Sequence, residues 1–125
     1  MIYGTGIDLV ENDRIAKIIA KWGDKFLSRI FTPGEIAYCG RHFHSAIHYG
    51  ARFAAKESFL KAIGTGMGRG VQMLDIEVVR AESGKPRLRL HGEALRHIQE
   101  AGVREVHLSI THTKKYAQAM VVLEK

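Results

Sequence analysis

The sequence predicts an α+β domain in which a mainly antiparallel sheet packs against helices. The first observation is the order of the predicted elements, which runs from one strand through several helices to a hairpin, a helix and a second hairpin. The second is the length of 125 residues, which is enough to bury one hydrophobic core and too short for two ordinary domains. We therefore expect a single domain that spans residues 1–125.

The first elements are a strand and a helix. Residues 2–10 alternate between two faces, which places Asp8 on the same side of the strand as two glycines. The next segment has isoleucines at helical spacing, and Asn12 or Asp13 is placed to cap its start. Gly23 is expected to end or bend this helix.

Two further helices follow in the first half of the chain. Thr32 and Glu35 form a capping box with Pro33 at the first helical position, which predicts a short helix. A longer helix is expected over residues 45–63. The glycine-rich residues 64–70 then predict a flexible loop.

The second half of the chain predicts two hairpins separated by a helix. The segments "MLDIEVVR" and "KPRLRLHG" alternate apolar and polar residues around the turn "ESGKP". The segment "EALRHIQEAG" predicts a helix that Gly102 closes. The segments "VREVHLSITH" and "YAQAMVVLE" predict the second hairpin.

Composition limits the class of protein and suggests its partners. Hydrophobic residues make up 46% of the chain and charged residues 26%, which is typical of a globular protein. No apolar run approaches the roughly 20 residues that span a bilayer, and the N-terminus does not resemble a signal peptide, so we expect a cytoplasmic protein without a membrane partner. A single cysteine, Cys39, fits a reducing compartment. The net charge of +6 predicts an anionic partner.

The predicted helix at 51–63 is apolar almost all round and yet carries four charges, Arg52, Lys56, Glu57 and Lys61. A buried charge needs a partner, which can be a side chain, a metal or a bound ion. One interpretation is that Glu57 and Lys61, four residues apart, form a simple ion pair. That interpretation leaves Arg52 and Lys56 repelling each other, and a bound anion would remove the repulsion.

A second carboxylate belongs to Asp8, and its role has two interpretations. Asp8 can cap the helix that follows its strand. Alternatively, Asp8 and Glu57 can hold Mg²⁺ together, because this ion is usually bound by one or two carboxylates, waters and substrate phosphates. The glycine-rich loop after the long helix has the chemistry to approach phosphate oxygens closely. These residues therefore suggest a site for Mg²⁺ and a phosphate.

Six motifs cover essentially the whole chain. They are "GIDLVE" (6–11), "FTPGE" (31–35), "RFAAKESFLKAIGTG" (52–66), "DIEV" (75–78), "GKPRLRLHG" (84–92) and "LSITHTKKYAQAMVV" (108–122). The combination of G-x-D with a later K-E-x-x-x-K is specific in so short a sequence. Together the motifs resemble the holo-[acyl-carrier-protein] synthase family of bacterial 4'-phosphopantetheinyl transferases, and this resemblance implies the 4'-phosphopantetheinyl transferase fold.

The resemblance also implies a reaction. These enzymes transfer the phosphopantetheine arm of coenzyme A to a serine of apo acyl carrier protein with Mg²⁺, release adenosine 3',5'-bisphosphate and support fatty acid biosynthesis. Glu57, directly or through a metal-bound water, is the expected base for the serine proton. The family enzymes resemble trimers with sites between protomers, and we expect a homotrimer here.

The family positions assign roles residue by residue. Asp8 and Glu57 match the metal ligands, and Lys61 matches a lysine that contacts the pyrophosphate and stabilises the leaving group. Arg52 and His112 match positions that reach the nucleotide of coenzyme A from the neighbouring subunit. The remaining predicted coenzyme A contacts are Gly64, Gly66, Lys85 and Pro86.

A basic stripe on the first helix is expected to bind the acidic carrier protein. Arg14 matches a family position that docks the carrier. Lys17, Lys21 and Lys25 extend the stripe by helical spacing. The alternative is an ordinary solvated face, which is the usual place for lysines.

Two other functions compete with this interpretation, a small basic RNA-binding protein and a purely structural trimer, and the trimer would leave the charges of the long helix unexplained. A small basic RNA-binding protein without catalysis would explain the charge, but carboxylates would repel nucleic acid and no aromatic pattern for base stacking is present, so we expect no nucleic acid partner. Cys39, His42, His44 and His48 suggest zinc, but their spacing matches no closed structural zinc site.

Overall fold

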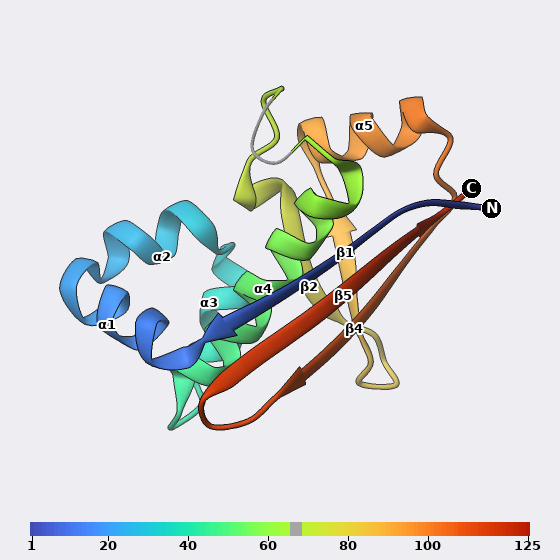
Figure 1. Cartoon of the computed structure of the whole chain (residues 1–125). Coiled ribbons are helices and arrows are strands. Elements are labelled where there is room, and N and C mark those ends of the chain that lie inside the picture. The colour runs from blue at the N-terminus through green and yellow to red at the C-terminus, as the bar shows by residue number, and fades with distance from the viewer. Residues whose placement is uncertain (66–68) are drawn as a thin grey trace.

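The computed structural model describes residues 1–65 and 69–125 as an α+β fold with antiparallel sheets, as predicted (Figure 1). The predicted strands, hairpins and helices are confirmed, and a short 3₁₀ helix, η1 (Met73–Asp75), precedes the first hairpin. The elements are, in chain order, β1 (Ile2–Glu11), α1 (Asn12–Trp22), α2 (Asp24–Ile30), α3 (Pro33–Gly40), α4 (Ser45–Ile63), β2 (Ile76–Arg80), β3 (Pro86–Leu90), α5 (Gly92–Ala101), β4 (Glu105–His112) and β5 (Tyr116–Glu124).

The strands form two separate sheets. One has three strands in the order β1-β5-β4, and the other is the β2-β3 hairpin. All neighbours pair antiparallel. Both ends of the chain lie together at one end of the larger sheet, where the backbones of Met1 and Lys125 bond to each other (Figure 1).

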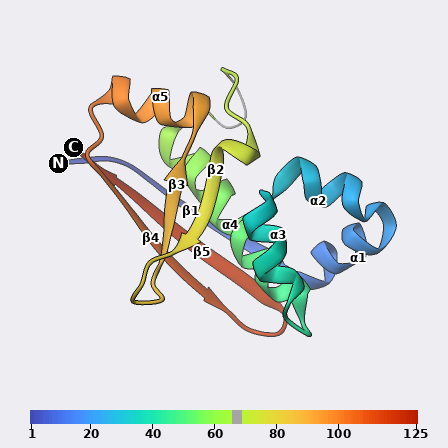
Figure 2. The ribbon, with the colours of Figure 1, turned by 180° about the vertical axis from the view of Figure 1, so that it is seen from behind.

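Helix α4 is the centre of the molecule. It packs across β1 and β5 on one side, and β2 and α3 contact it as well; Figure 2 shows the hairpin on the side of α4 away from the larger sheet. Burial on several sides explains why its sequence is apolar almost all round. Although α4 has 19 residues, neither it nor any other helix of the described ranges is long and apolar enough to cross a membrane.

Two glycines of β1 allow α4 to approach the strand closely. A Cβ atom at Gly4 would lie 2.1 Å from the carbonyl oxygen of Ala62, and one at Gly6 would lie 1.8 Å from that of Ser58. Both distances are far below ordinary contact, so only glycine permits this packing. Ser58 is itself fully buried, and its hydroxyl donates to the carbonyl oxygen of Ala119 on β5.

The predicted helix ends are confirmed with one exception. Thr32 and Glu35 form the reciprocal capping box at the start of α3. The expectation that Asn12 or Asp13 caps α1 is wrong, because the N-cap is Glu11 and makes no side-chain capping bond. Asn12 is buried, and its Nδ2 donates to the carbonyl oxygens of Thr113 and Lys114 in the β4-β5 turn.

Candidate active site

Asp8 lies on β1 beside the second half of α4. The Nζ atom of Lys61 donates to Asp8 Oδ1 over 3.0 Å and to the carbonyl oxygen of Ile7 over 2.9 Å. The prediction that Lys61 forms a simple ion pair with Glu57 is therefore wrong. The carboxylate partner of Lys61 is Asp8. The interpretation of Asp8 as a helix cap is also wrong, because α1 begins four residues later, at Asn12, and has no side-chain cap.

Glu57 shares a cleft of about 320 Å³ with Asp8 and Arg14. We call this space the carboxylate cleft. Burial, together with the neighbouring Asp8 carboxylate, raises the pKa of Glu57 above its ordinary value, and Lys61 offsets this only in part. Two carboxylates that repel each other in a partly enclosed cleft form a favourable position for a cation.

The carboxylate cleft meets the requirements of Mg²⁺. The described residues contain no group of three or more histidine, cysteine, aspartate or glutamate side chains that could hold a metal. Mg²⁺ does not need such a group, because it is bound by one or two carboxylates and takes its other ligands from waters and substrate phosphates. Asp8 and Glu57 are the residues that would hold it.

Lys56 has a protein partner and does not face the cleft. It is fully buried, and its Nζ donates to Glu35 Oε1 over 2.8 Å and to the carbonyl oxygens of Met73 and Ile76. Glu35 is equally buried and also accepts from the backbone of Val78. The expectation that a bound anion balances the charge of Lys56 is therefore wrong. The Glu35 carboxylate, 21 residues away in sequence, balances this charge instead.

Arg52 lies in a different cluster on the other side of α4. Its guanidinium is 4.1 Å from the ring centroid of Tyr38, and those of Arg41 and Arg80 lie 5.5 and 5.4 Å from the same centroid. We call Arg41, Arg52 and Arg80 the arginine cluster. His42 and His48 stack beside it with ring centroids 3.8 Å apart, and the ring of His112 is 5.9 Å from that of His48.

The predicted site residues thus fall into two groups in one chain. Asp8 and His112 lie on β1 and β4, the two edges of the larger sheet, which are about 10 Å apart across β5. Arg52 and Glu57 are five residues apart on α4, which turns their side chains about 140° from each other around the helix axis. One chain does not bring all of the predicted residues to a single place.

The other predicted coenzyme A residues divide in the same way. Lys85 and Pro86 belong to the β2-β3 hairpin, where Pro86 pairs with Arg80 of the arginine cluster. Gly64 follows α4 in the left-handed conformation with φ of 79°, three residues after Lys61. Gly66 lies outside the described residues.

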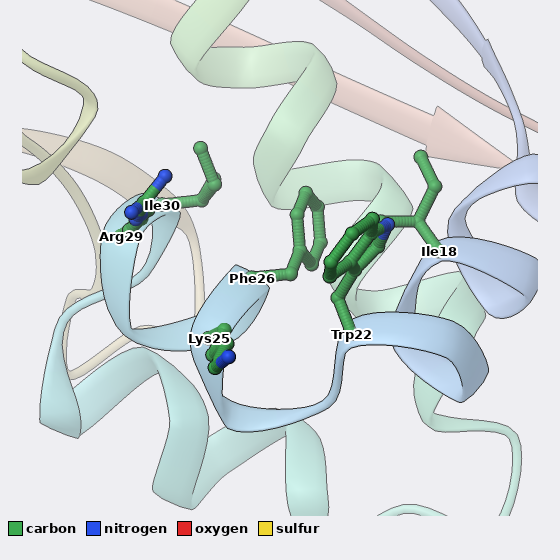
Figure 3. Close-up of a pocket in the computed structure, with 6 residues that line it drawn as sticks. All are labelled: Ile18, Trp22, Lys25, Phe26, Arg29 and Ile30. Carbon is green, nitrogen blue, oxygen red and sulfur yellow. The ribbon is translucent and has the colours of Figure 1, made fainter.

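The basic stripe lies on α1 and α2. Arg14, Lys17, Lys21 and Lys25 are all exposed. Arg14 lines the carboxylate cleft, and Lys25 lines a neighbouring cavity of about 610 Å³. Figure 3 shows the residues of this second cavity, which come from both helices: Ile18, Trp22, Lys25, Phe26, Arg29 and Ile30. Ile18 and Phe26 line both spaces, so the second cavity adjoins the carboxylate cleft.

Sequence reasoning missed Tyr38 and Arg80. Tyr38 follows the capping box on α3, and Arg80 ends β2, so 42 residues separate them. Arg80 Nη1 donates to the hydroxyl of Tyr38 over 2.8 Å. No local pattern links the two residues, because a tyrosine on a helix and an arginine at a strand end are common separately.

Comparison with known proteins gives a consistent result over the whole chain. The family model of the 4'-phosphopantetheinyl transferase superfamily matches residues 4–121. The holo-[acyl-carrier-protein] synthase of Syntrophus aciditrophicus is 50% identical over 99% of this chain and 97% of its own length. The crystal structure of the same enzyme from Neisseria meningitidis is 37% identical, with a TM-score of 0.90 over all of both chains. That of Bacillus anthracis, in complex with CoA (3',5'-ADP), is 42% identical, with a TM-score of 0.81 over 100% of this chain and 98% of that one.

Proposed function

Because this chain belongs to the 4'-phosphopantetheinyl transferase superfamily, among the holo-[acyl-carrier-protein] synthases, we propose that it transfers the 4'-phosphopantetheine group of coenzyme A to a serine hydroxyl of an apo acyl carrier protein. The chain is an enzyme, a phosphopantetheinyl transferase. Membership of a transferase family argues against the alternative of a non-catalytic RNA-binding protein. The observation that carries the proposed reaction is the carboxylate cleft, where Asp8 and Glu57 lie together beside Lys61.

The reaction is a phosphoryl transfer, which depends mainly on positioning and on charge stabilisation. The serine oxygen forms a bond to the β-phosphorus, and the bond from that phosphorus to adenosine 3',5'-bisphosphate breaks. Glu57 accepts the serine proton, since its carboxylate lies with Asp8 in the cleft that the serine would enter. Lys61, whose side chain is 54% exposed, is free to turn its ammonium toward the departing phosphate.

Asp8 and Glu57 would hold Mg²⁺ in this reaction. The ion would neutralise charge on the pyrophosphate. Asp8 would exchange its contact with Lys61 for the ion, which leaves Lys61 available to the phosphate. The repulsion between the two carboxylates in the metal-free chain supports this role, because a bound cation would relieve it.

We propose that coenzyme A lies between subunits. The carboxylate cleft of one subunit would act on the pyrophosphate with Lys61, Gly64 and Gly66. Arg52, Lys85, Pro86 and His112 of the neighbouring subunit would contact the nucleotide. Their separation from the carboxylates within one chain supports this arrangement, because a single chain carries two incomplete halves.

The outer face of the larger sheet supports a homotrimer. Helix α4 covers the inner face of this sheet, whereas the outer face carries Ile7, Leu9 and Met120 with 54%, 60% and 45% of their surfaces exposed. Exposed apolar side chains grouped in this way are typical of contacts between subunits. Light scattering should give the mass of three 14.0 kDa chains, and a monomer mass would contradict the assembly.

The basic stripe is the proposed docking surface for the acidic carrier protein. Arg14, Lys17, Lys21 and Lys25 would contact carrier carboxylates, and the exposed ring of Trp22 would add apolar contact. The position of Arg14 in the carboxylate cleft would bring the carrier serine close to Glu57. We propose a cytoplasmic enzyme with a single domain. Its product would be the holo acyl carrier protein, which fatty acid biosynthesis requires.

Mass spectrometry of the carrier protein tests the reaction. Incubation of apo acyl carrier protein with the enzyme, coenzyme A and Mg²⁺ should add one phosphopantetheine, roughly 340 Da from its formula. EDTA and Glu57→Gln should abolish the gain, whereas Glu105→Gln, at an exposed glutamate of β4, should not. Absence of any gain with several carrier proteins would refute the proposal.

Charge reversal tests the docking surface separately. Changing Arg14 and Lys21 to glutamate should raise the KM for the carrier protein far more than the KM for coenzyme A. Changing Arg104 and Lys125 to glutamate alters the net charge equally. Both residues lie beside the chain termini, where their backbones bond to Glu124 and Met1, so this variant is the matched control. An unchanged KM for the carrier at low salt would contradict the docking surface.

A further inference from the structure

Ser58 places a fully buried hydroxyl group inside α4. Serine is less favourable than alanine in the interior of a helix, so its presence there needs an explanation from the tertiary structure. The Ser58 hydroxyl lies 2.7 Å from the carbonyl oxygen of Ala54, one turn earlier on α4, and 2.9 Å from that of Ala119 on β5. The first bond stays within the helix, whereas the second joins α4 to the larger sheet.

The bond to Ala119 reaches the residue that is paired with Asp8. Asp8 and Ala119 are direct partners in the antiparallel register of β1 and β5. Their Cα atoms are therefore about 5 Å apart. Ser58 directly follows Glu57 on α4. One side-chain hydrogen bond thus connects the neighbour of one carboxylate with the strand partner of the other.

Glu57 lies between two buried anchors of α4. On one side, the Ser58 hydroxyl bonds to β5, and its carbonyl oxygen lies so close to β1 that a Cβ atom at Gly6 would be 1.8 Å away. On the other side, Lys56 Nζ makes three hydrogen bonds, one each to α3, η1 and β2. Successive side chains of a helix project about 100° apart, so the two anchors restrict rotation of α4 and fix the direction of Glu57.

The hydroxyl bond adds a restraint that close packing does not provide. Contact between α4 and β1 limits how near the two elements can approach, but it does not prevent them from separating or sliding. A hydrogen bond is directional and weakens when its atoms move apart or out of line. The bond from Ser58 to Ala119 therefore opposes both displacements beside the carboxylate cleft.

We propose that Ser58 is a positioning residue that holds Asp8 and Glu57 at the separation that Mg²⁺ requires. Mg²⁺ demands near-ideal octahedral geometry with bonds of about 2.0–2.1 Å, so a small change in the spacing of its ligands weakens binding. Ser58 acts through its bond to β5 and not by touching the ion. The inference rests on the proposed function, which assigns Mg²⁺ to these two carboxylates.

Binding of Mn²⁺, which shares the preference of Mg²⁺ for oxygen ligands, tests the proposal with the full-length chain. The electron paramagnetic resonance signal of free Mn²⁺ gives the bound fraction in the presence of coenzyme A, and Asp8→Asn corrects for metal that coenzyme A binds alone. Ser58→Ala should raise the Kd for Mn²⁺ about tenfold, as expected when the support of a metal ligand is lost. Alanine is the best helix former, so this variant should fold, which a thermal melt will verify.

A matched variant separates this role from a general loss of stability. Ala51→Gly weakens α4 at another buried position through helix propensity but removes no side-chain bond to the sheet. It should lower Tm and leave the Kd for Mn²⁺ unchanged. In transfer assays, Ser58→Ala should need about tenfold more Mg²⁺ for half-maximal rate, with an unchanged KM for the carrier protein. An unchanged Kd for Mn²⁺ in Ser58→Ala, or an equal increase in Ala51→Gly, would overturn the proposal.

The same measurements distinguish failure of this inference from failure of the proposed function. Binding of Mn²⁺ does not require transfer to a carrier protein, so it is measurable even in an inactive protein. Transfer by the wild type, with Mn²⁺ binding that Ser58→Ala leaves unchanged, would refute the inference alone. Weaker Mn²⁺ binding in Ser58→Ala, with no transfer by the wild type, would refute the proposed function alone.

Discussion

Replacement of Gly6 with alanine tests whether close contact between β1 and α4 holds the two carboxylates together. Gly6 lies two residues before Asp8, on a strand that is paired with β5 along its length. A Cβ atom at Gly6 would lie 1.8 Å from the carbonyl oxygen of Ser58, which follows Glu57 on α4. The added methyl group therefore acts directly on the spacing between the elements that carry Asp8 and Glu57.

The size of the effect follows from this distance. Ordinary van der Waals contact begins at 3.4 Å, so the carbon–oxygen distance must increase by about 1.6 Å, and the obstructing atoms belong to the backbone of a buried helix. Overpacking of this kind should lower the free energy of unfolding by about 3 kcal/mol. For a domain of this size, the loss corresponds to a decrease in Tm of roughly 10 °C. A displacement of about 1 Å at a catalytic group should lower kcat on the order of 10²-fold.

Urea unfolding and carrier-protein modification measure the two effects. The matched control is Gly40→Ala, because a Cβ atom at Gly40, the last residue of α3, meets nothing within 4 Å. The control should stay within about 1 kcal/mol of wild type and retain full activity. If Gly6→Ala is as stable and as active as Gly40→Ala, then the close packing of β1 on α4 does not position the carboxylates.

Three further predictions concern charged side chains. Glu57→Gln should raise Tm in metal-free buffer, since it removes a half-buried charge that Asp8 repels, and should abolish transfer; an unchanged or lower Tm would contradict the repulsion. Lys56→Met should lower the free energy of unfolding by about 3–5 kcal/mol, because it leaves Glu35 charged and buried, and a loss below about 1 kcal/mol in urea would refute this. Burial and neighbouring cations lower the pKa of His48 to about 4, so the folded state binds fewer protons than the unfolded chain, and stability should fall as pH decreases from about 6.5 toward 4. His48→Leu should reduce that decline between pH 7.5 and pH 5 in urea titrations, and an identical decline would show that His48 does not cause it.

Most of the fold was predictable because its signals are local. The capping box of Thr32 and Glu35 joins residues three apart, and the left-handed Gly102 ends α5 through its own backbone bonds. Alternation along β1 likewise reports which side chains share a face. Such signals depend only on residues a few positions apart, so they can be read from the sequence without knowledge of the tertiary structure. The cap of α1 was mispredicted because Asn12 bonds instead to a turn about 100 residues away.

The site was predictable in part. The spacing of Glu57 and Lys61 on one helix, and the position of Asp8 beside glycines on a strand, were sufficient to suggest that the three side chains lie together. They do meet, but Lys61 contacts Asp8 and not Glu57. Sequence spacing along a helix limits which residues can be neighbours, whereas the choice among partners depends on the strand that packs against it.

The chain's own pattern was thus enough to establish the α+β class, the central apolar helix and the residue types of a metal and phosphate site. The packing of distant elements determined the rest: Glu35 as the partner of Lys56, and Tyr38 with Arg80 beside Arg52. Periodicity states which face of an element is buried but not which element covers it. Long-range partners are selected when the core closes around α4, and that selection places two halves of the proposed site on opposite edges of one sheet.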